Sequence, residues 1–477
     1  MEAKKFVNRY KYLFKNIGLL TLSSFATKLL SFFLVPLYTN ILSTTEYGTY
    51  DLFNTTIGVL LPILTLNIQE SVIRFAMDDK FDRRAIVSTC TKFFLGANLL
   101  VAAGLGINAI FGFSAIVKEY ALYFFLMFLA QSLSGIVVAY IRGTDRITDL
   151  SISSVIASAV TIGLNILFLA VFKMGLVGYF LANIIGPLMQ SVYLVFRSDM
   201  LRNMAWKKGF AKERREMLNY CEPMIANSIA WWVNSASDRY VVVFFCGLAE
   251  NGIYSVASKI PSILNIFQTI FNQAWTLSAV RDFDPEDKNG FFSHTYRAYN
   301  CLMVVMCSAI IVADKILAKF LYAKDFFVAW KYVPWLTIAI VFGALSGYIG
   351  GVFSAVKNSK IFAQSTAIGA VLNLALNIAF TPMIGALGAA IATAVSYMVV
   401  WAVRYRSSRQ YIKLQINIVR DLASYGILVV QAVALLLLEG AMVYWVEGAL
   451  FLGMVAIYAK DVGLVVRKVL QKKKGAA

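Results

Sequence analysis

The stretch from Leu13 to Leu42 reads LFKNIGLLTLSSFATKLLSFFLVPLYTNIL and is long and apolar enough to cross a lipid bilayer as a helix. Lys28 lies near its middle, 12 residues before Asn40, which places it about 18 Å from the outer end of the segment. A lysine at that depth costs roughly 2.5 to 3.5 kcal/mol on insertion scales. We therefore expect Lys28 to face protein or water, with Ser24 and Ser31 on the same helical face lining a wet cavity.

The composition places the chain among membrane proteins. Of its 477 residues, 59% are hydrophobic and 15% charged, and the mean hydropathy is +0.69. A soluble globular protein carries more charge than this. The excess of 44 Lys and Arg over 26 Asp and Glu does not indicate nucleic-acid binding, because these residues are spread between apolar segments instead of covering one soluble face. We predict an all-α polytopic membrane protein with no nucleic-acid partner.

Fourteen apolar segments reach spanning length when charged and Gly- or Pro-containing turns are taken as separators. They cover residues 13–41, 46–72, 85–111, 119–141, 150–172, 176–197, 219–246, 250–279, 296–321, 332–356, 361–382, 385–405, 422–441 and 443–465.

The distribution of Lys and Arg gives the orientation. If the segments alternate in direction, 34 of the 44 basic residues fall at the two termini and in the connections on one side, and only six fall on the other side. Basic residues next to spans are retained in the cytoplasm. Both termini are therefore predicted to be cytoplasmic, in a multi-pass protein of the cytoplasmic (inner) cell membrane. Four of the six exceptions lie between Lys315 and Lys331, a cluster that this rule does not explain.

Short motifs recur in the same order at a nearly constant offset. The pattern E-x-G-x-Y occurs at residues 46–50 and 250–254, L-N-I-x-F at 164–168 and 376–380, and G-x-x-G at 175–178 and 385–388. Such repetition indicates two halves of six helices each, related by a parallel pseudo-two-fold axis because six is even. The predicted domains are an N-terminal bundle (1–199), a basic cytoplasmic linker (200–218), a C-terminal bundle (219–410), and two extra transmembrane helices with a basic cytoplasmic tail (411–477).

Polar residues at helical spacing predict which segments line the cavity. The second segment carries Asp51 and Asn54, the seventh carries Asn234 and Asp238 beside Arg239, and the eighth carries Ser262 and Asn265 near Lys259. Lys28, Arg239 and Lys259 outnumber the two acids Asp51 and Asp238 at cavity depth. An excess of cations suits an anionic substrate such as a pyrophosphate.

Structural alternatives remain open for these residues. Asp238, Arg239 and Lys259 can neutralise one another, and Arg74 can form an i,i+4 pair with Glu70 at the membrane surface. Asp51 and Asp238 are also candidates for coupling transport to an ion, H⁺ or Na⁺. Beyond that ion we expect no cofactor, no metal site and no catalytic residue, because the chain has no Walker A sequence and its cysteines lack zinc-ligand spacing.

Several motifs also resemble a known family. They are Lys28, Pro36-Leu37-Tyr38, the turn at residues 46–51, Glu70 with Arg74-Phe75, Asp238-Arg239-Tyr240, Gly252-Ile253-Tyr254 and Ala257-Ser258-Lys259. In these the chain is similar, over essentially its whole length, to bacterial oligosaccharide-lipid flippases of the superfamily that also contains multidrug exporters and lipid II flippases. The resemblance implies a V-shaped cavity between two bundles and alternating access. It also implies a pyrophosphate site, which falls on Lys28, Arg239 and Lys259, with Arg74 as a fourth substrate-binding candidate.

The function that these expectations favour is export of an undecaprenyl-pyrophosphate-linked oligosaccharide repeat unit for capsule, O-antigen or exopolysaccharide synthesis, by a protein that is not an enzyme. Its expected partners are the lipid-linked oligosaccharide, membrane lipids, and the polysaccharide polymerase and glycosyltransferases of the same route. The alternatives are a cation-coupled drug or small-molecule antiporter of the same superfamily, a lipid II flippase and a polysaccharide polymerase.

Overall fold

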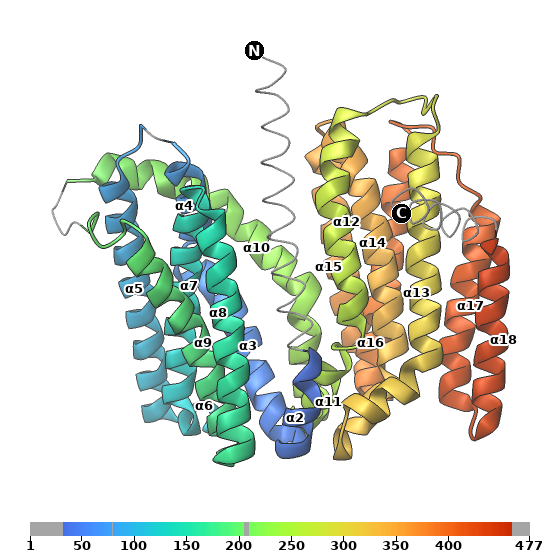
Figure 1. Ribbon diagram of the computed structural model, residues 1–477, viewed down its shortest axis with the longest axis horizontal. Helices are drawn as coiled ribbons and strands as arrows, with labels where there is room; N and C mark the ends of the chain where they lie inside the picture. The colour runs from blue at the N-terminus through green and yellow to red at the C-terminus, as the bar shows by residue number, and fades with distance from the viewer. Residues whose placement is uncertain (1–31, 79, 205–208, 460–477) are drawn as a thin grey trace, which may run out of the picture. The chain divides into compact units, whose positions relative to one another are not determined.

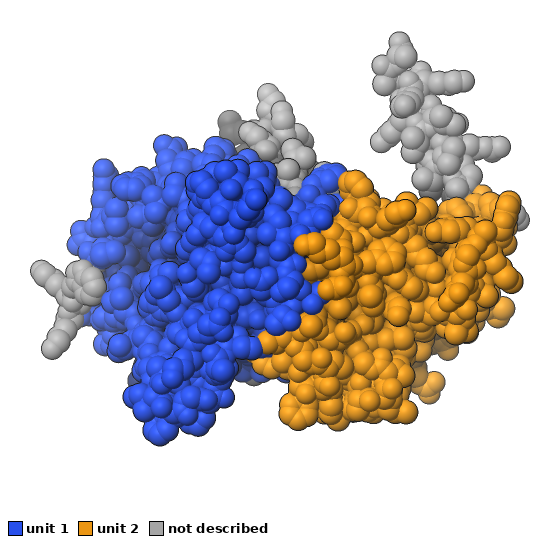
Figure 2. Space-filling model, turned by 90° about the horizontal axis from the view of Figure 1, so that it is seen from below, with its two compact units in different colours: residues 1–236 blue, residues 237–477 orange. Residues whose placement is uncertain are grey.

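The computed structural model describes residues 32–78, 80–204 and 209–459, and within these ranges all regular structure is helical (Figure 1). The predicted all-α fold is confirmed. The chain forms two compact units, Met1–Ala236 and Ser237–Ala477, which Figure 2 colours separately. The division between them falls inside one long helix, α10 (Ala211–Cys246), later in the chain than the linker predicted at residues 200–218.

Unit 1 buries its apolar residues in two clusters. One joins α3, α5, α7 and α9 around Phe53, Phe128 and Phe180. The other joins α4, the start of α5, the end of α7 and the first turns of α10, where Met217 is fully buried. The helices of unit 1 before α10 are α2 (Val35–Ile41), α3 (Thr44–Leu64), α4 (Ile68–Ala76), α5 (Arg83–Phe111), α6 (Ala115–Glu119), α7 (Ala121–Gly143), α8 (Ile147–Asn165), the π-helix η1 (Ile166–Val171) and α9 (Gly175–Arg197).

Unit 2 has a core rich in aromatic rings. Trp275 stacks on Tyr348 with 4.2 Å between ring centroids, and its indole N–H donates to the Tyr348 carbonyl at 2.8 Å. Such rings bury a large apolar area while their polar atoms stay hydrogen-bonded. The elements of unit 2 after α10 are α11 (Leu248–Ala257), α12 (Pro261–Arg281), α13 (Phe291–Leu321), the 3₁₀ helix η2 (Lys324–Lys331), α14 (Val333–Ala355), α15 (Ser359–Ile384), α16 (Ala386–Ser408), α17 (Ile418–Leu437) and α18 (Ala441–Ile457).

The helices follow the predicted membrane segments closely. Within the described ranges nine helices are long and apolar enough to cross a membrane, or ten if the bent pair α3 and α4 is one span. Helices α10 and α12 also lie at predicted segments, but they carry too many polar residues to pass the same criterion, and α18 is 17 residues long. Most of the first predicted segment lies outside the described residues, so the total of fourteen stays a prediction.

The internal repeat has a structural counterpart in each unit. Gly178 of α9 lies against Phe168 of η1, and Gly388 of α16 lies against Phe380 of α15, so close that an added Cβ would come within 3 Å of that residue in both cases. Asn165 and Asn377 are both buried and both donate their side-chain amide to the carbonyl four residues earlier. The repeated motifs therefore mark the same helix–helix contact in both halves.

The second predicted segment is broken where α3 ends and α4 begins. The two helices differ in direction by 60°. Between them Leu66 and Asn67 adopt left-handed backbone conformations, with φ of 51° and 52°. The Asn67 side chain donates to the Ser228 hydroxyl of α10 at 3.1 Å, which holds the break against a neighbouring helix of the same unit.

Candidate functional site

Asp238 and Arg239 lie in the part of α10 that belongs to unit 2. Asp238 is buried, and its carboxylate accepts a 2.6 Å hydrogen bond from the Tyr254 hydroxyl of α11 and a 3.0 Å hydrogen bond from the Arg239 backbone N–H. The Arg239 side chain is 19% exposed, and its Nη1 lies 4.0 Å from Asp238 Oδ1. A charge-assisted hydrogen bond is shorter than this. The two predicted residues therefore meet, but the close partner of the carboxylate is Tyr254.

A chain of polar side chains continues from Tyr254 through the bundle. Thr393 of α16 lies beside Tyr254, donates its hydroxyl to the Ala389 carbonyl at 3.0 Å, and accepts from the Asn373 amide of α15 at 3.2 Å. Asn377 donates to Asn373 Oδ1 at 3.1 Å. No described residue donates to Asn377 Oδ1 or hydrogen-bonds the Thr381 hydroxyl, although both atoms are buried. The sequence analysis missed this chain, and the only signal was Asn377, which belongs to the repeated L-N-I-x-F motif.

Lys259 occupies a break between helices. The predicted eighth segment is two helices, α11 and α12, and Lys259 lies in the turn between them, two residues before Pro261. Its side chain is half-buried, and no ion pair joins it to an acidic residue within the described ranges. The neighbouring Ser262 hydroxyl donates to the Lys259 carbonyl at 2.6 Å, and Asn265 is exposed. The structure therefore does not include Lys259 in the Asp238–Arg239 pair.

The predicted residues of α3 lie in unit 1. Asp51 is buried, whereas Asn54 is exposed and accepts a hydrogen bond from the Gln131 amide of α7 at 3.0 Å. At the next residue, the Trp232 indole N–H of α10 donates to the Thr55 carbonyl at 3.0 Å. These contacts place the polar face of α3 against α7 and the first part of α10.

The remaining candidates are not gathered by the structure. Arg74 is exposed near the end of α4, and no ion pair with Glu70 forms within this described helix, so the alternative of an i,i+4 pair is not seen there. Lys28, Ser24 and Ser31 lie outside the described residues, as does the side chain of Asn234.

One buried cation escaped the sequence analysis. Arg404 of α16 is 5% exposed and donates to the Ser365 hydroxyl, the Ser346 carbonyl and the Thr366 hydroxyl, each at 2.9 Å. Its guanidinium also lies 4.0 Å from the centroid of the Phe362 ring. Because Arg404 is close to the end of its segment, it looked like an ordinary cytoplasmic flanking residue. Its hydrogen bonds are satisfied by these neutral groups, which gives it a structural role inside unit 2.

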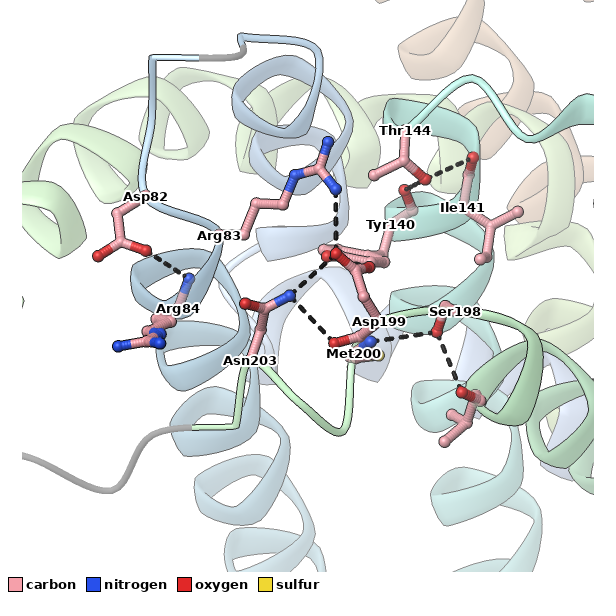
Figure 3. A network of polar contacts seen from close by, with 11 residues as sticks. Asp82, Arg83, Arg84, Tyr140, Ile141, Thr144, Ser198, Asp199, Met200 and Asn203 are labelled. Carbon is pink, nitrogen blue, oxygen red and sulfur yellow. Dashed lines mark hydrogen bonds and ion pairs between the residues drawn. The ribbon is translucent and has the colours of Figure 1, made fainter.

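A polar network ties the chain after α9 to the rest of unit 1 (Figure 3). The Asp199 carboxylate accepts from the Arg83 guanidinium at 3.0 Å and from the Tyr140 hydroxyl at 2.9 Å, and Asn203 adds a 3.0 Å contact (Figure 3). Partial burial by itself would raise the pKa of Asp199, but these hydrogen bonds and the charge of Arg83 lower it below the ordinary value of 3.8. The connection to α10 is thus anchored by an ionised carboxylate.

The described residues contain no group of three or more His, Cys, Asp or Glu side chains that would hold a metal ion. The candidate site therefore consists of a cation and a carboxylate on α10, a polar chain into α15 and α16, and a lysine at the break between α11 and α12. Such a donor set can hold an anion at its cations and a small cation or a proton at its carboxylate.

The chain is similar to a curated protein, to solved structures and to a family of proteins. One curated relative, described as the probable low-salt glycan biosynthesis flippase Agl15 of Haloferax volcanii, is 23% identical over 313 residues, or 62% of this chain and 63% of the relative. The alignment thus spans less than two thirds of the relative's length. The lipid II flippase MurJ in an inward closed conformation superposes with a TM-score of 0.69 at 14% identity, covering 94% of this chain and 99% of that chain.

An inward-facing multidrug resistance transporter of the MATE family superposes with a TM-score of 0.66 at 13% identity, covering 84% of this chain and 96% of that chain. At such identities these structures show the fold alone, which this chain shares with both of them. Residues 13–276, more than half of the chain, match the family described as Polysaccharide biosynthesis protein. The chain is therefore a multi-pass membrane protein that belongs to the Polysaccharide biosynthesis protein family.

Proposed function

We propose that this protein is a flippase that moves an undecaprenyl-pyrophosphate-linked oligosaccharide repeat unit across the cytoplasmic membrane by alternating access, for capsule, O-antigen or exopolysaccharide synthesis. Membership of the family supports a role in polysaccharide synthesis. The fold shared with MOP-superfamily transporters supports transport over catalysis. The relative from Haloferax volcanii carries the description of a glycan flippase.

The observation that carries the proposal is the position of Arg239. It is a largely buried cation inside a helix of spanning length, at 4.0 Å from its carboxylate neighbour. A charge at such a position is expected to face protein or water and to serve function. Its planar guanidinium matches pyrophosphate oxygens, and Lys259, Lys28 and Arg74 add further positive charge. The lipid tail then stays in the bilayer while the head group crosses.

Substitution of Arg239 tests this function. R239A should lower the transport of a labelled lipid-linked oligosaccharide into proteoliposomes at least tenfold, and R239K should fall between R239A and the wild type because it keeps the charge but loses the planar fork. K259A and K28A should also reduce transport. K92A is the matched control, because Lys92 is an exposed basic residue of another spanning helix, α5.

Unchanged transport by R239A, K259A and K28A would contradict the pyrophosphate site. Drug resistance on overexpression without oligosaccharide transport would instead favour the antiporter.

The same transport assay under imposed H⁺ or Na⁺ gradients tests whether an ion gradient drives transport. We propose that Asp238 is the coupling carboxylate, since the hydroxyl of Tyr254 and the polar chain behind it suit a small cation or a proton. D238N should therefore remove the dependence on the gradient, and D51N should not.

A further inference from the structure

Two carboxyl groups are buried in the last part of unit 2, away from the candidate site. Asp314 of α13 and Glu447 of α18 are 0% and 1% exposed. Figure 1 shows α13, α17 and α18 side by side, and these helices contact one another. Asp314 lies seven residues before the end of α13 and Glu447 six residues after the start of α18, so each is about 10 Å from the end of its helix. The two groups therefore sit at a similar level in a three-helix bundle.

The hydrogen bonds around this pair are incomplete. The Ser308 hydroxyl of α13 donates to Gln431 Oε1 of α17 at 2.7 Å, and Gln431 Nε2 donates to Glu447 Oε2 at 3.0 Å. Glu447 Oε1 and both oxygens of Asp314 receive no hydrogen bond from any described residue. Buried polar atoms are normally paired, and a buried carboxylate without partners is strongly unfavourable.

The charges nearby do not balance two carboxylates. Among the described residues, Lys315 is the cation whose charge acts on both carboxyl groups, and the charge of Glu447 acts on Asp314. The Lys315 ammonium also lies 4.4 Å from the centroid of the Trp330 ring of η2. Two ionised carboxyl groups would therefore leave one uncompensated negative charge in a buried site, and a single bound proton removes it.

Other titratable groups on the neighbouring elements face elsewhere. Tyr348 of α14 donates to the Phe292 carbonyl near the start of α13, at the opposite end of that helix from Asp314. A second polar layer, also far from Asp314 along α13, joins α13, α17 and α18 around Asn300, and it contains Arg420, Asp421, Tyr425 and Tyr458. Arg281 ends α12 next to Asp282, and Lys319, Lys324, Asp325, Lys331 and Tyr444 are exposed.

We propose that Asp314 and Glu447 form a proton-binding site that holds one proton at neutral pH. The ligand is H⁺, because a single proton balances the two carboxylates against the one charge of Lys315. The site also gives a role to Lys315, one of the basic residues that the positive-inside rule leaves unexplained. The proposal does not depend on the transported substrate.

Infrared difference spectroscopy of the full-length protein in lipid nanodiscs tests this site. A protonated carboxyl group absorbs at a different infrared frequency from a carboxylate. The spectrum of the wild type at pH 7 should therefore contain the band of one buried protonated carboxyl group. D314N should abolish that band, and so should E447Q, because in either variant Lys315 neutralises the one remaining carboxylate. D199N is the control. It removes a partly exposed, ion-paired carboxylate and should leave the band unchanged.

Absence of the band in the wild type at pH 7 would overturn the proposal, as would a band that survives both D314N and E447Q. If D314N does not fold, E447Q and a pH titration of the wild type test the proposal in its place. In the titration, the band should disappear as the pH is raised. Replacing Na⁺ by choline at constant pH should leave the intensity of this band unchanged. A band that grows when Na⁺ is removed would assign the site to a metal cation instead.

Discussion

At the scale of single residues, glycines set how closely helices approach in each unit. A Cβ on Gly388 would lie 2.6 Å from the backbone carbonyl carbon and oxygen of Phe380. The neighbouring backbone cannot yield as a flexible side chain can, so helix α16 would have to move. In unit 1 the contact of Gly178 is less tight, with a Cβ 2.9 Å from the Phe168 Cβ and 3.3 Å from its carbonyl oxygen.

We expect G388A to destabilise the protein by about 1–3 kcal/mol, because overpacking at a tight contact costs that much. G178A should cost less. The control is G426A in α17, where a Cβ meets nothing within 4 Å and alanine improves the helix by up to about 1 kcal/mol. Thermal unfolding in detergent measures all three, and equal midpoints for G388A and G426A would disprove the tight contact.

At the scale of elements, the break between α3 and α4 is favoured by one residue of its own sequence, Pro62, and opposed by another, Leu66. Pro62 lies inside α3 and cannot donate a backbone hydrogen bond. Leu66 has a φ of 51°, a conformation that is common for Gly and Asn but unfavourable for Leu. The contact between Asn67 and Ser228 stabilises the break, so its geometry depends on α10 as well as on local residues.

Replacing Leu66 tests whether the left-handed turn is real. L66G should be at least as stable as the wild type, because relief of roughly 1 kcal/mol of backbone strain offsets the loss of a partly exposed side chain. L66V should lower the unfolding midpoint, since a β-branched residue tolerates this conformation least. A variant L66V that is more stable than L66G would mean that the chain runs through this position as a regular helix.

At the scale of the whole molecule, the spans and their directions are set by hydropathy and charge. Lys173 and Lys357 are a matched pair, because both are exposed in connections and have φ values of 53° and 57°. The helices between them are α9, α10, the pair α11 and α12, α13 and α14. If each of these crosses the membrane, the two lysines lie on opposite sides.

A membrane-impermeant maleimide should therefore label K173C in intact cells and K357C only after permeabilisation. The native cysteines are buried or half-buried, so the protein without either substitution should label weakly and serves as the negative control. Labelling of both positions from one side would mean that only one of the polar helices α10 and α12 spans the membrane. Reversed labelling would place both termini outside the cytoplasm.

The sequence predicted the class of fold well because apolar length and turn residues are local signals. The pair Asp238 and Arg239 was also within reach, since two adjacent charged residues inside an apolar segment are an evident local signal. The sequence did not predict the contacts of Tyr254 with Asp238, or of Gln431 with Glu447, because each joins helices whose relative rotation is decided by packing. Asp314 and Glu447 were overlooked as well, since a single acid in an apolar segment does not reveal its partner.

The π-helix η1 has a consequence for how the two halves diverged. From Asn165 to Gly175 the chain needs ten residues, whereas from Asn377 to Gly385 it needs eight. The first half holds the two additional residues in a stretch of wider helical winding and a three-residue connection, and the second half uses α15 and Gly385 alone. The same glycine-to-phenylalanine contact forms in both units. A duplicated ancestor could thus gain or lose residues at this corner without changing which surfaces meet.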